Sequence, residues 1–245
     1  MTPPPIVLLH GWGLSAAVWT PLRDHLSPAH IIHAPDLPGH GSAAPAGDTL
    51  ASWADALVAT LPDKALVVGW SLGGMLALHI ARHYPQKVAR LVLIDTTPRF
   101  VQADDWQPAL SAATLADFRH NFDADPPATQ RRFVALQSLG DAARKTVSAS
   151  LGDALTPSDE SHQPALATGL RLLAETDLRD LIPAVTQPVR LLHGGEDKLM
   201  PVAAAEWLAD TLPNARLSVF GDAGHAPFVS RAQECAALIE SFALD

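Results

Sequence analysis

Apolar residues along this chain fall into short runs that alternate with longer amphipathic stretches. Six runs are apolar enough to be buried β-strands, at residues 5–10, 31–34, 65–69, 89–94, 189–193 and 216–220. Helical spacing of apolar positions predicts helices over residues 49–61, 72–84, 202–212 and 227–242. Short buried strands that alternate with helices are typical of an α/β fold, in which helices cover both faces of a mostly parallel sheet.

The stretch from residue 99 to residue 185 breaks this alternation. It contains no run that predicts a strand, but it is rich in helix formers and carries large aromatic side chains, namely Trp106, Phe118, Phe122 and Phe133. We therefore predict an α/β core made of residues 1–98 and 186–245. Residues 99–185 form a helical cap above the carboxyl ends of the strands, where parallel sheets bind their ligands.

Composition narrows the class of function. The formal net charge is −9 and there is no basic run, which argues against nonspecific nucleic-acid binding. The longest apolar runs are far too short to cross a bilayer, and the N-terminal residues lack the features of a signal peptide. The single cysteine, Cys235, permits no internal disulfide and suits a reducing compartment. We expect a cytoplasmic monomer without a nucleic-acid or membrane partner.

The strongest chemical signal is a Gly-x-Ser-x-Gly pattern, which reads Gly-Trp-Ser-Leu-Gly over residues 69–73. It stands between a predicted strand and a predicted helix, the setting in which a sharp turn presents a serine nucleophile. Glycines two residues before and two after Ser71 avoid the collisions that such a turn would force on side chains. Ser71 is therefore the predicted nucleophile. The alternative is an ordinary glycine-rich turn with a capping serine.

A serine hydroxyl needs a base within hydrogen-bond reach and an acid that orients the base. His225 lies in a glycine-rich loop just after the last predicted strand, and Asp197 follows the strand before it. Both loops leave carboxyl ends of strands, the edge that also presents Ser71, in the chain order serine, acid, histidine. We predict His225 as the base and Asp197 as the acid. Glu196 and Asp95, which ends the fourth strand, are the alternatives for the acid.

An oxyanion hole requires two N–H groups aimed at one point. Leu72, which follows the nucleophile, supplies one of them. The turn His10-Gly-Trp-Gly13 after the first strand is placed to supply the other from Trp12. The alternative is that Trp12 only packs in a turn.

Taken together, these residues resemble the α/β-hydrolase superfamily over nearly the whole chain. Within it, the chain looks like the pimeloyl-acyl-carrier-protein methyl ester esterases of biotin synthesis. The matching stretches are VLLHGWGL (7–14), DLPG (36–39), GWSLGG (69–74), RFVALQ (132–137), TDLR (176–179) and AGHAPF (223–228). The stretch RFVALQ lies in the predicted cap and is far more selective for this family than the first and third stretches, which many hydrolases share.

The resemblance implies a carboxylesterase that hydrolyses the methyl ester of pimeloyl-acyl-carrier protein through Ser71, Asp197 and His225, without a metal or cofactor. It also implies that Trp12 and Leu72 line the oxyanion side of the site. In the cap, it implies that five consecutive residues face the substrate chain, namely Phe133, Val134, Ala135, Leu136 and Gln137.

Cationic residues of the cap form a local cluster in an otherwise acidic protein. The resemblance implies that such residues meet the phosphopantetheine phosphate and the acidic carrier protein, and arginine suits phosphate oxygens. Ala128 stands where the family pattern leads us to expect another arginine. The cluster comprises Arg131, Arg132, Arg144 and Lys145. The alternative is that these residues form a solvated helix face.

Two further classes of function stay open, because a fold does not fix a substrate. One is a different hydrolase with the same triad, such as a general short-chain carboxylesterase, a cofactor-free haloperoxidase-like enzyme or a carbon–carbon bond hydrolase. The other is a noncatalytic ligand-binding protein on the same scaffold.

Overall fold

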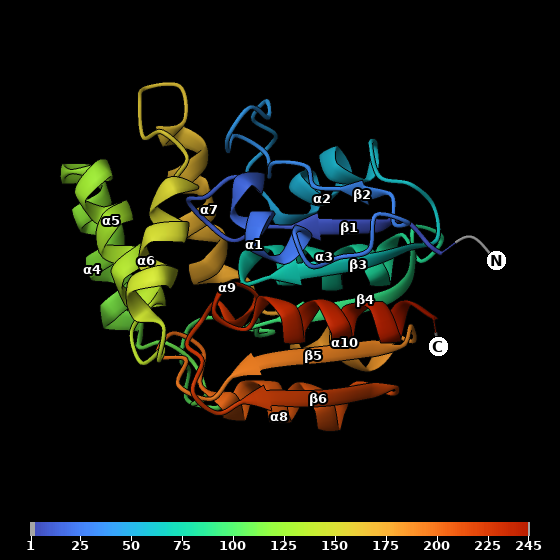
Figure 1. Cartoon of the computed structure of the whole chain (residues 1–245). Helices are drawn as coiled ribbons and strands as arrows, with labels where there is room; N and C mark the ends of the chain where they lie inside the picture. The colour runs from blue at the N-terminus through green and yellow to red at the C-terminus, as the bar shows by residue number, and fades with distance from the viewer. Residues whose placement is uncertain (1–2, 245) are drawn as a thin grey trace.

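A six-stranded, wholly parallel sheet forms the centre of the computed structural model, which describes residues 3–244 (Figure 1). Its strand order is β2-β1-β3-β4-β5-β6, so the chain moves outward in both directions from β1 and β3. The strands are β1 (Ile6–Leu9), β2 (Ile32–His33), β3 (Ala65–Trp70), β4 (Val88–Ile94), β5 (Val189–Gly194) and β6 (Ala215–Phe220). The predicted α/β fold and all six predicted strands are confirmed.

Alternate residues of each strand pack on opposite faces of the sheet. On β1, Val7 and Leu9 belong to one apolar cluster, whereas Ile6 and Leu8 belong to the other. Because both faces are covered, the strands read as continuous apolar runs without polar alternation. The first cluster includes residues of α2 (Leu50–Val58), α3 (Leu72–His83) and α8 (Val202–Thr211), and the second includes residues of α1 (Thr20–Arg23), α9 (Pro227–Ser230) and α10 (Ala232–Leu244).

Three local expectations need correction. The second strand is shorter than predicted, because β2 lies at the edge of the sheet, pairs only with β1 and is half-buried. The predicted closing helix over residues 227–242 is two helices, since the backbone leaves helical geometry at Arg231 (φ −127°, ψ 38°). The short helices over residues 16–23, η1 (Ala16–Trp19) and α1, were not predicted.

Between residues 99 and 185 the chain is helical, as expected, and its strand-like pairings are isolated bridges. Four helices in this stretch lie together beside the carboxyl ends of the strands (Figure 1). They are α4 (Ala112–Ala124), α5 (Pro126–Gln137), α6 (Arg144–Asp153) and α7 (Gln163–Glu175), and we call them the cap helices; η2 (Arg179–Ala184) then leads back to β5. The boundaries of the cap as a separate domain stay a prediction. Every helix in the described part of the chain is too short or too polar to cross a bilayer.

Candidate active site

The turn between β3 and α3 holds Ser71 in a left-handed backbone conformation, with φ 55° and ψ −121°. Such a conformation costs a non-glycine residue about 1–3 kcal/mol and persists only when its surroundings enforce it. Here the end of β4 enforces it: the Ser71 N–H donates to the Ile94 carbonyl at 3.1 Å, and the Thr96 hydroxyl donates to the Ser71 carbonyl at 2.7 Å. A Cβ on Gly73 would collide with the carbonyl oxygen of Leu9. The glycine pattern is therefore required by close backbone approach.

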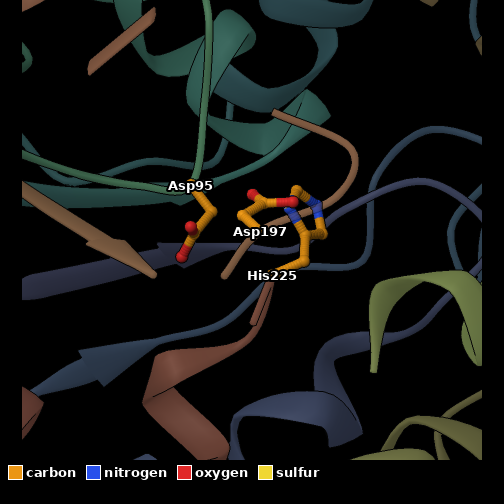
Figure 2. A group of neighbouring side chains, drawn as sticks. All are labelled: Asp95, Asp197 and His225. Atoms are coloured by element: carbon orange, nitrogen blue, oxygen red, sulfur yellow. The ribbon is translucent and has the colours of Figure 1, made fainter. Parts of the chain in front are cut away.

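His225 and Asp197 lie against each other at the same edge of the sheet, and both are buried (Figure 2). Nδ1 of His225 donates to Oδ2 of Asp197 at 2.6 Å. The other oxygen of Asp197 accepts the backbone N–H groups of Leu199 and Met200. Burial alone would raise the pKa of Asp197, but the charge and hydrogen bond of His225 outweigh it, so the pKa lies below its usual value. This carboxylate is thus held ionised and aimed at the imidazole.

The remaining ring nitrogen of His225, Nε2, is buried and has no hydrogen-bond partner among residues 3–244. The histidine backbone is fixed from the core and from the cap, because Nε1 of Trp70 donates to its carbonyl at 2.7 Å and its N–H donates to the Gln137 carbonyl at 3.2 Å. The ring is therefore oriented by its backbone and by Asp197, and Nε2 is left available for a proton transfer.

The two alternative acids have other positions. Glu196 is about half exposed and forms an ion pair with Lys198 at 2.8 Å. Asp95 is fully buried and close to Asp197, but it accepts its hydrogen bond from the Gly194 N–H and not from the histidine. The structure therefore brings Asp197, and neither alternative, into hydrogen bonding with His225.

Asp95, Asp197 and His225 also form the one group of potential metal-binding side chains found among the described residues, with donor atoms within 4.8 Å of one another. The acid and the imidazole, however, bond directly to each other, and the second Asp197 oxygen already accepts two N–H groups. Both oxygens of Asp197 and Nδ1 of His225 are therefore already engaged by contacts within the protein, and the predicted absence of a metal stays a prediction.

The two predicted oxyanion residues follow neighbouring strands, because Leu72 comes directly after Ser71 at the end of β3 and Trp12 comes after β1, which pairs with β3. Leu72 is the first residue of α3, so its N–H has no partner within the helix. Trp12 follows β1, and its buried ring packs edge-on against Phe133 with the ring centres 5.0 Å apart. Its Nε1 donates to the carbonyl of Leu166 on α7 at 2.7 Å. The Trp12 ring thus ties core to cap, and the role of its backbone N–H stays a prediction.

Five consecutive residues of α5 cannot share one face, because a helical turn takes 3.6 residues. Phe133, Val134 and Gln137 are buried, Leu136 is half-buried and Ala135 is exposed. Ala135 therefore departs from the expectation that the whole stretch faces inward, and helical periodicity already contained this signal. Both polar atoms of the Gln137 amide are buried without a partner among the described residues.

All four residues of the predicted cationic cluster are exposed. They belong to two cap helices, α5 and α6, which are neighbours (Figure 1). Arg131 and Arg132 lie in the middle of α5, and Arg144 and Lys145 begin α6. Among residues 3–244, none of the four forms an ion pair. The guanidinium of Arg132 lies over the ring of Phe118, 5.2 Å from its centre. The four charges are thus available to an anionic partner.

One residue of the site gave no sequence signal. Asp141, just after α5, is buried, and its Oδ2 accepts the N–H of Gly224 and the hydroxyl of Ser230, each at 2.8 Å. These contacts join the cap to the loop of His225 across more than 80 positions of sequence. In the sequence Asp141 reads as an ordinary turn residue, so only the tertiary structure reveals it.

Comparison with known proteins extends this picture. A family model described as the alpha/beta hydrolase fold matches residues 4–232. A pimeloyl-[acyl-carrier protein] methyl ester esterase of Aromatoleum aromaticum is 53% identical over 245 residues, covering 98% of each chain. Esterases of the same description from Nitrosomonas europaea and Chromobacterium violaceum are 38% and 40% identical, over 93% and 94% of this chain and 90% and 91% of theirs.

Solved structures show the same fold at lower identity. An esterase from Exiguobacterium antarcticum superposes with a TM-score of 0.84 at 22% identity, covering 99% of this chain and 92% of its own. A bromoperoxidase from Bacillus anthracis gives a TM-score of 0.85 at 20% identity, covering 100% and 93%. At this identity the likeness speaks for the fold alone.

Proposed function

This chain belongs to the pimeloyl-[acyl-carrier protein] methyl ester esterases of the α/β-hydrolase family, and we propose that it hydrolyses the methyl ester of a pimeloyl chain borne by an acyl-carrier protein in biotin synthesis. The observation that carries the chemistry is the buried hydrogen bond from His225 to Asp197, with Nε2 of the histidine left free. The full-length similarity to esterases of this description supports the choice of substrate.

In the first half of the reaction, the Ser71 hydroxyl attacks the ester carbonyl while Nε2 of His225 takes its proton. The imidazolium that forms is stabilised by the ionised carboxylate of Asp197. The N–H groups of Trp12 and Leu72 bind the oxyanion. Collapse of the tetrahedral intermediate breaks the bond to the methoxy group, which leaves as methanol with the proton from His225.

In the second half, a water molecule gives a proton to His225 and attacks the acyl-enzyme. When the second tetrahedral intermediate collapses, the bond to Ser71 breaks and His225 returns its proton to the serine oxygen. The chain leaves as a free carboxylic acid, which ionises in water. The proton transfers of Ser71, of the leaving methoxy group and of the attacking water all pass through one imidazole, and no step requires a metal ion or an organic cofactor.

Substrate binding uses the cap. The buried side chains of Phe133 and Val134 offer apolar contact to a carbon chain, and the unpartnered amide of Gln137 offers hydrogen bonds to its polar end. The exposed cationic cluster, Arg131, Arg132, Arg144 and Lys145, supplies local positive charge to an acidic carrier protein, which the net charge of −9 would otherwise repel. We also expect the enzyme to act as a cytoplasmic monomer.

The chemistry is tested with Ser71→Ala. The variant is expected to lose activity on any ester by about a thousandfold or more and to escape labelling by a fluorophosphonate probe. Ser138→Ala, which changes a buried serine of the cap, is the matched control and keeps both. Full esterase activity in Ser71→Ala would refute the triad.

The carrier contact is tested by charge reversal on α5. Arg131→Glu combined with Arg132→Glu is expected to lower kcat/KM on the carrier-bound methyl ester about tenfold or more, without changing the rate on free dimethyl pimelate. Arg216→Glu reverses one exposed charge on the edge strand β6, away from the cap, and is the control for each single reversal. Equal losses on both esters would contradict a carrier role for the cluster.

The biological role is tested genetically. Expression of the chain is expected to restore growth without biotin in a bacterial host that lacks its own esterase of this kind, and Ser71→Ala is expected to fail. A protein that hydrolyses short esters but never restores growth would be a general carboxylesterase.

A further inference from the structure

Asp95 is a buried carboxyl group that the proposed reaction does not use. It follows β4 directly, in a left-handed backbone conformation with φ 39°, and its side chain is fully buried. Oδ1 accepts the Gly194 N–H at 2.8 Å. Oδ2 is buried without a hydrogen-bond partner among residues 3–244. An acceptor oxygen in this situation carries a substantial desolvation cost unless a proton lies on it or next to it.

Among the described residues, the charged and titratable groups around Asp95 offer it no counterion. After burial, the neighbouring charge that raises the pKa of Asp95 the most is that of Asp197. One carboxylate oxygen of each aspartate and one ring nitrogen of His225 lie within 4.8 Å of one another. His193 on β5 faces Oδ1 with Nδ1 at 3.6 Å. Its Nε2 donates to the Met200 carbonyl, and burial lowers its pKa, so the ring is neutral and Nδ1 carries no proton. The cap adds the negative charge of Asp141, and α10 adds the thiol of Cys235.

Two carboxylates this close cannot both be ionised in a buried site. Asp197 is the ionised member, because it accepts a hydrogen bond from His225 and two from backbone N–H groups. From the part of the chain that the structure describes, Asp95 accepts one hydrogen bond, from Gly194. The proton shared by the pair therefore belongs on Asp95.

We propose that Asp95 is a neutral carboxylic acid whose Oδ2–H donates a hydrogen bond to the carboxylate of Asp197, which makes it a positioning residue of the triad. The three N–H donors to Asp197 leave one lone pair of its Oδ2 open to this bond. Figure 2 shows Asp197 between Asp95 and His225, so that the acid is held from both sides. The inference rests on the triad proposed above.

The electrostatics agree with the geometry. Burial, followed by the negative charge of Asp197, raises the pKa of Asp95 well above its ordinary value. In the unfolded chain the group ionises near its usual pKa. Between that pKa and the higher folded one, the unfolded state has released a proton that the folded state keeps, so stability falls as the pH rises.

Asp95→Asn tests the protonation state without relying on catalysis. The amide keeps an acceptor for Gly194 and a donor for Asp197, but it cannot ionise. Its Tm is expected to rise relative to wild type, by an amount that grows steadily from about pH 5 to about pH 8. An ionised Asp95 would give no such growth, and a pH-independent difference would overturn the proposal.

Asp36→Asn is the matched control, because it has the opposite sign. Burial alone would raise the pKa of Asp36, but N–H groups of Ser42 and Ala16 bind its ionised form and bring the pKa below its usual value. Its removal is expected to lower the Tm at neutral pH, with a difference that shrinks below about pH 4.

A positioning role is tested by the pH profile on a short activated ester, so that the carrier contact plays no part. Asp95→Asn is expected to keep kcat within about threefold, because its donor remains. Asp95→Val removes the donor, leaving the charge of Asp197 to act more strongly on protonated His225. Activity should then begin at a higher pH, with kcat lowered about tenfold and KM unchanged. A Val variant with the wild-type profile would make Asp95 merely structural.

An infrared difference spectrum between wild type and Asp95→Asn completes the test. A protonated carboxyl band, lost in the variant at neutral pH, is expected; a carboxylate band in its place would overturn the proposal. The infrared measurement and the Tm series need no turnover. They therefore test the protonation state of Asp95 separately from the proposed esterase activity.

Discussion

Substitution of Gly169, in the middle of α7, by alanine has two opposing effects on stability: a gain in helix propensity and a collision with neighbouring side chains. A helix-interior glycine is less favourable than alanine by about 1 kcal/mol, so Gly169→Ala should stabilise the helix. A Cβ at this position, however, would lie 2.6 Å from Cδ1 and 3.0 Å from Nε1 of Trp12, and 3.3 Å from the ring of Trp53. Both indoles are almost fully buried, so neither can swing aside freely.

The collision is the larger effect. Overpacking of a well-packed core costs about 1–3 kcal/mol, and displacement of the Trp12 ring also weakens its hydrogen bond to Leu166, at a cost of about 1 kcal/mol. After the gain in helix propensity, we expect a net loss of about 1–3 kcal/mol. In a chain of this size each kcal/mol shifts Tm by about 2–4 °C. Because Trp12 lies beside the proposed oxyanion hole, kcat/KM should fall as well.

Gly152, near the end of α6, is the control, because a Cβ there would meet nothing within 4 Å. Gly152→Ala should raise Tm by about 2–4 °C and leave activity unchanged. Urea unfolding and esterase assays on both variants measure the contrast. If Gly169→Ala stabilised the protein as Gly152→Ala does, the tight contact between α7 and Trp12 would be refuted.

Three further variants test other parts of the structure. Asp141→Ala leaves the buried N–H of Gly224 without its acceptor, so urea unfolding should show a free energy of unfolding lower by about 3 kcal/mol. The kcat should fall as well, and an unchanged kcat would mean that the cap does not hold the histidine loop. Thr96→Val removes one of several hydrogen bonds to the Ser71 carbonyl, so the free energy of unfolding should fall by about 1 kcal/mol while the enzyme stays active. A folded but inactive variant would contradict this. Asp177, whose pKa its arginine partners lower to about 2, gives stability that is present above about pH 4 and lost as the pH falls toward 2. The Tm difference between wild type and Asp177→Asn should therefore close over that range, and a difference that persisted at the acidic end would refute the assignment.

Much of the fold could be predicted from the sequence, because it depends on local stereochemistry. Strands buried on both faces leave unbroken apolar runs, and the sharp turn at Ser71 requires small residues two positions before and two positions after the serine. Both patterns can be recognised within a few positions of sequence. The order serine, acid, histidine is likewise a linear property. The length of an edge strand is less local. The strand β2 is short because it has a neighbouring strand on one side only, and its own residues do not show this.

The choice of acid shows what the tertiary structure alone decided. The sequence predicts Asp197 but leaves Glu196 and Asp95 open, because all three follow strand ends. In the structure only Asp197 forms a hydrogen bond with His225, across 28 positions. The same packing leaves Asp95 without a counterion and brings Asp141 from the cap onto the histidine loop. Sequence determines which residues stand at the rim of the sheet, because strand and turn patterns are local. Which of them touch, and which carry a proton, depends on burial and on partners distant along the chain.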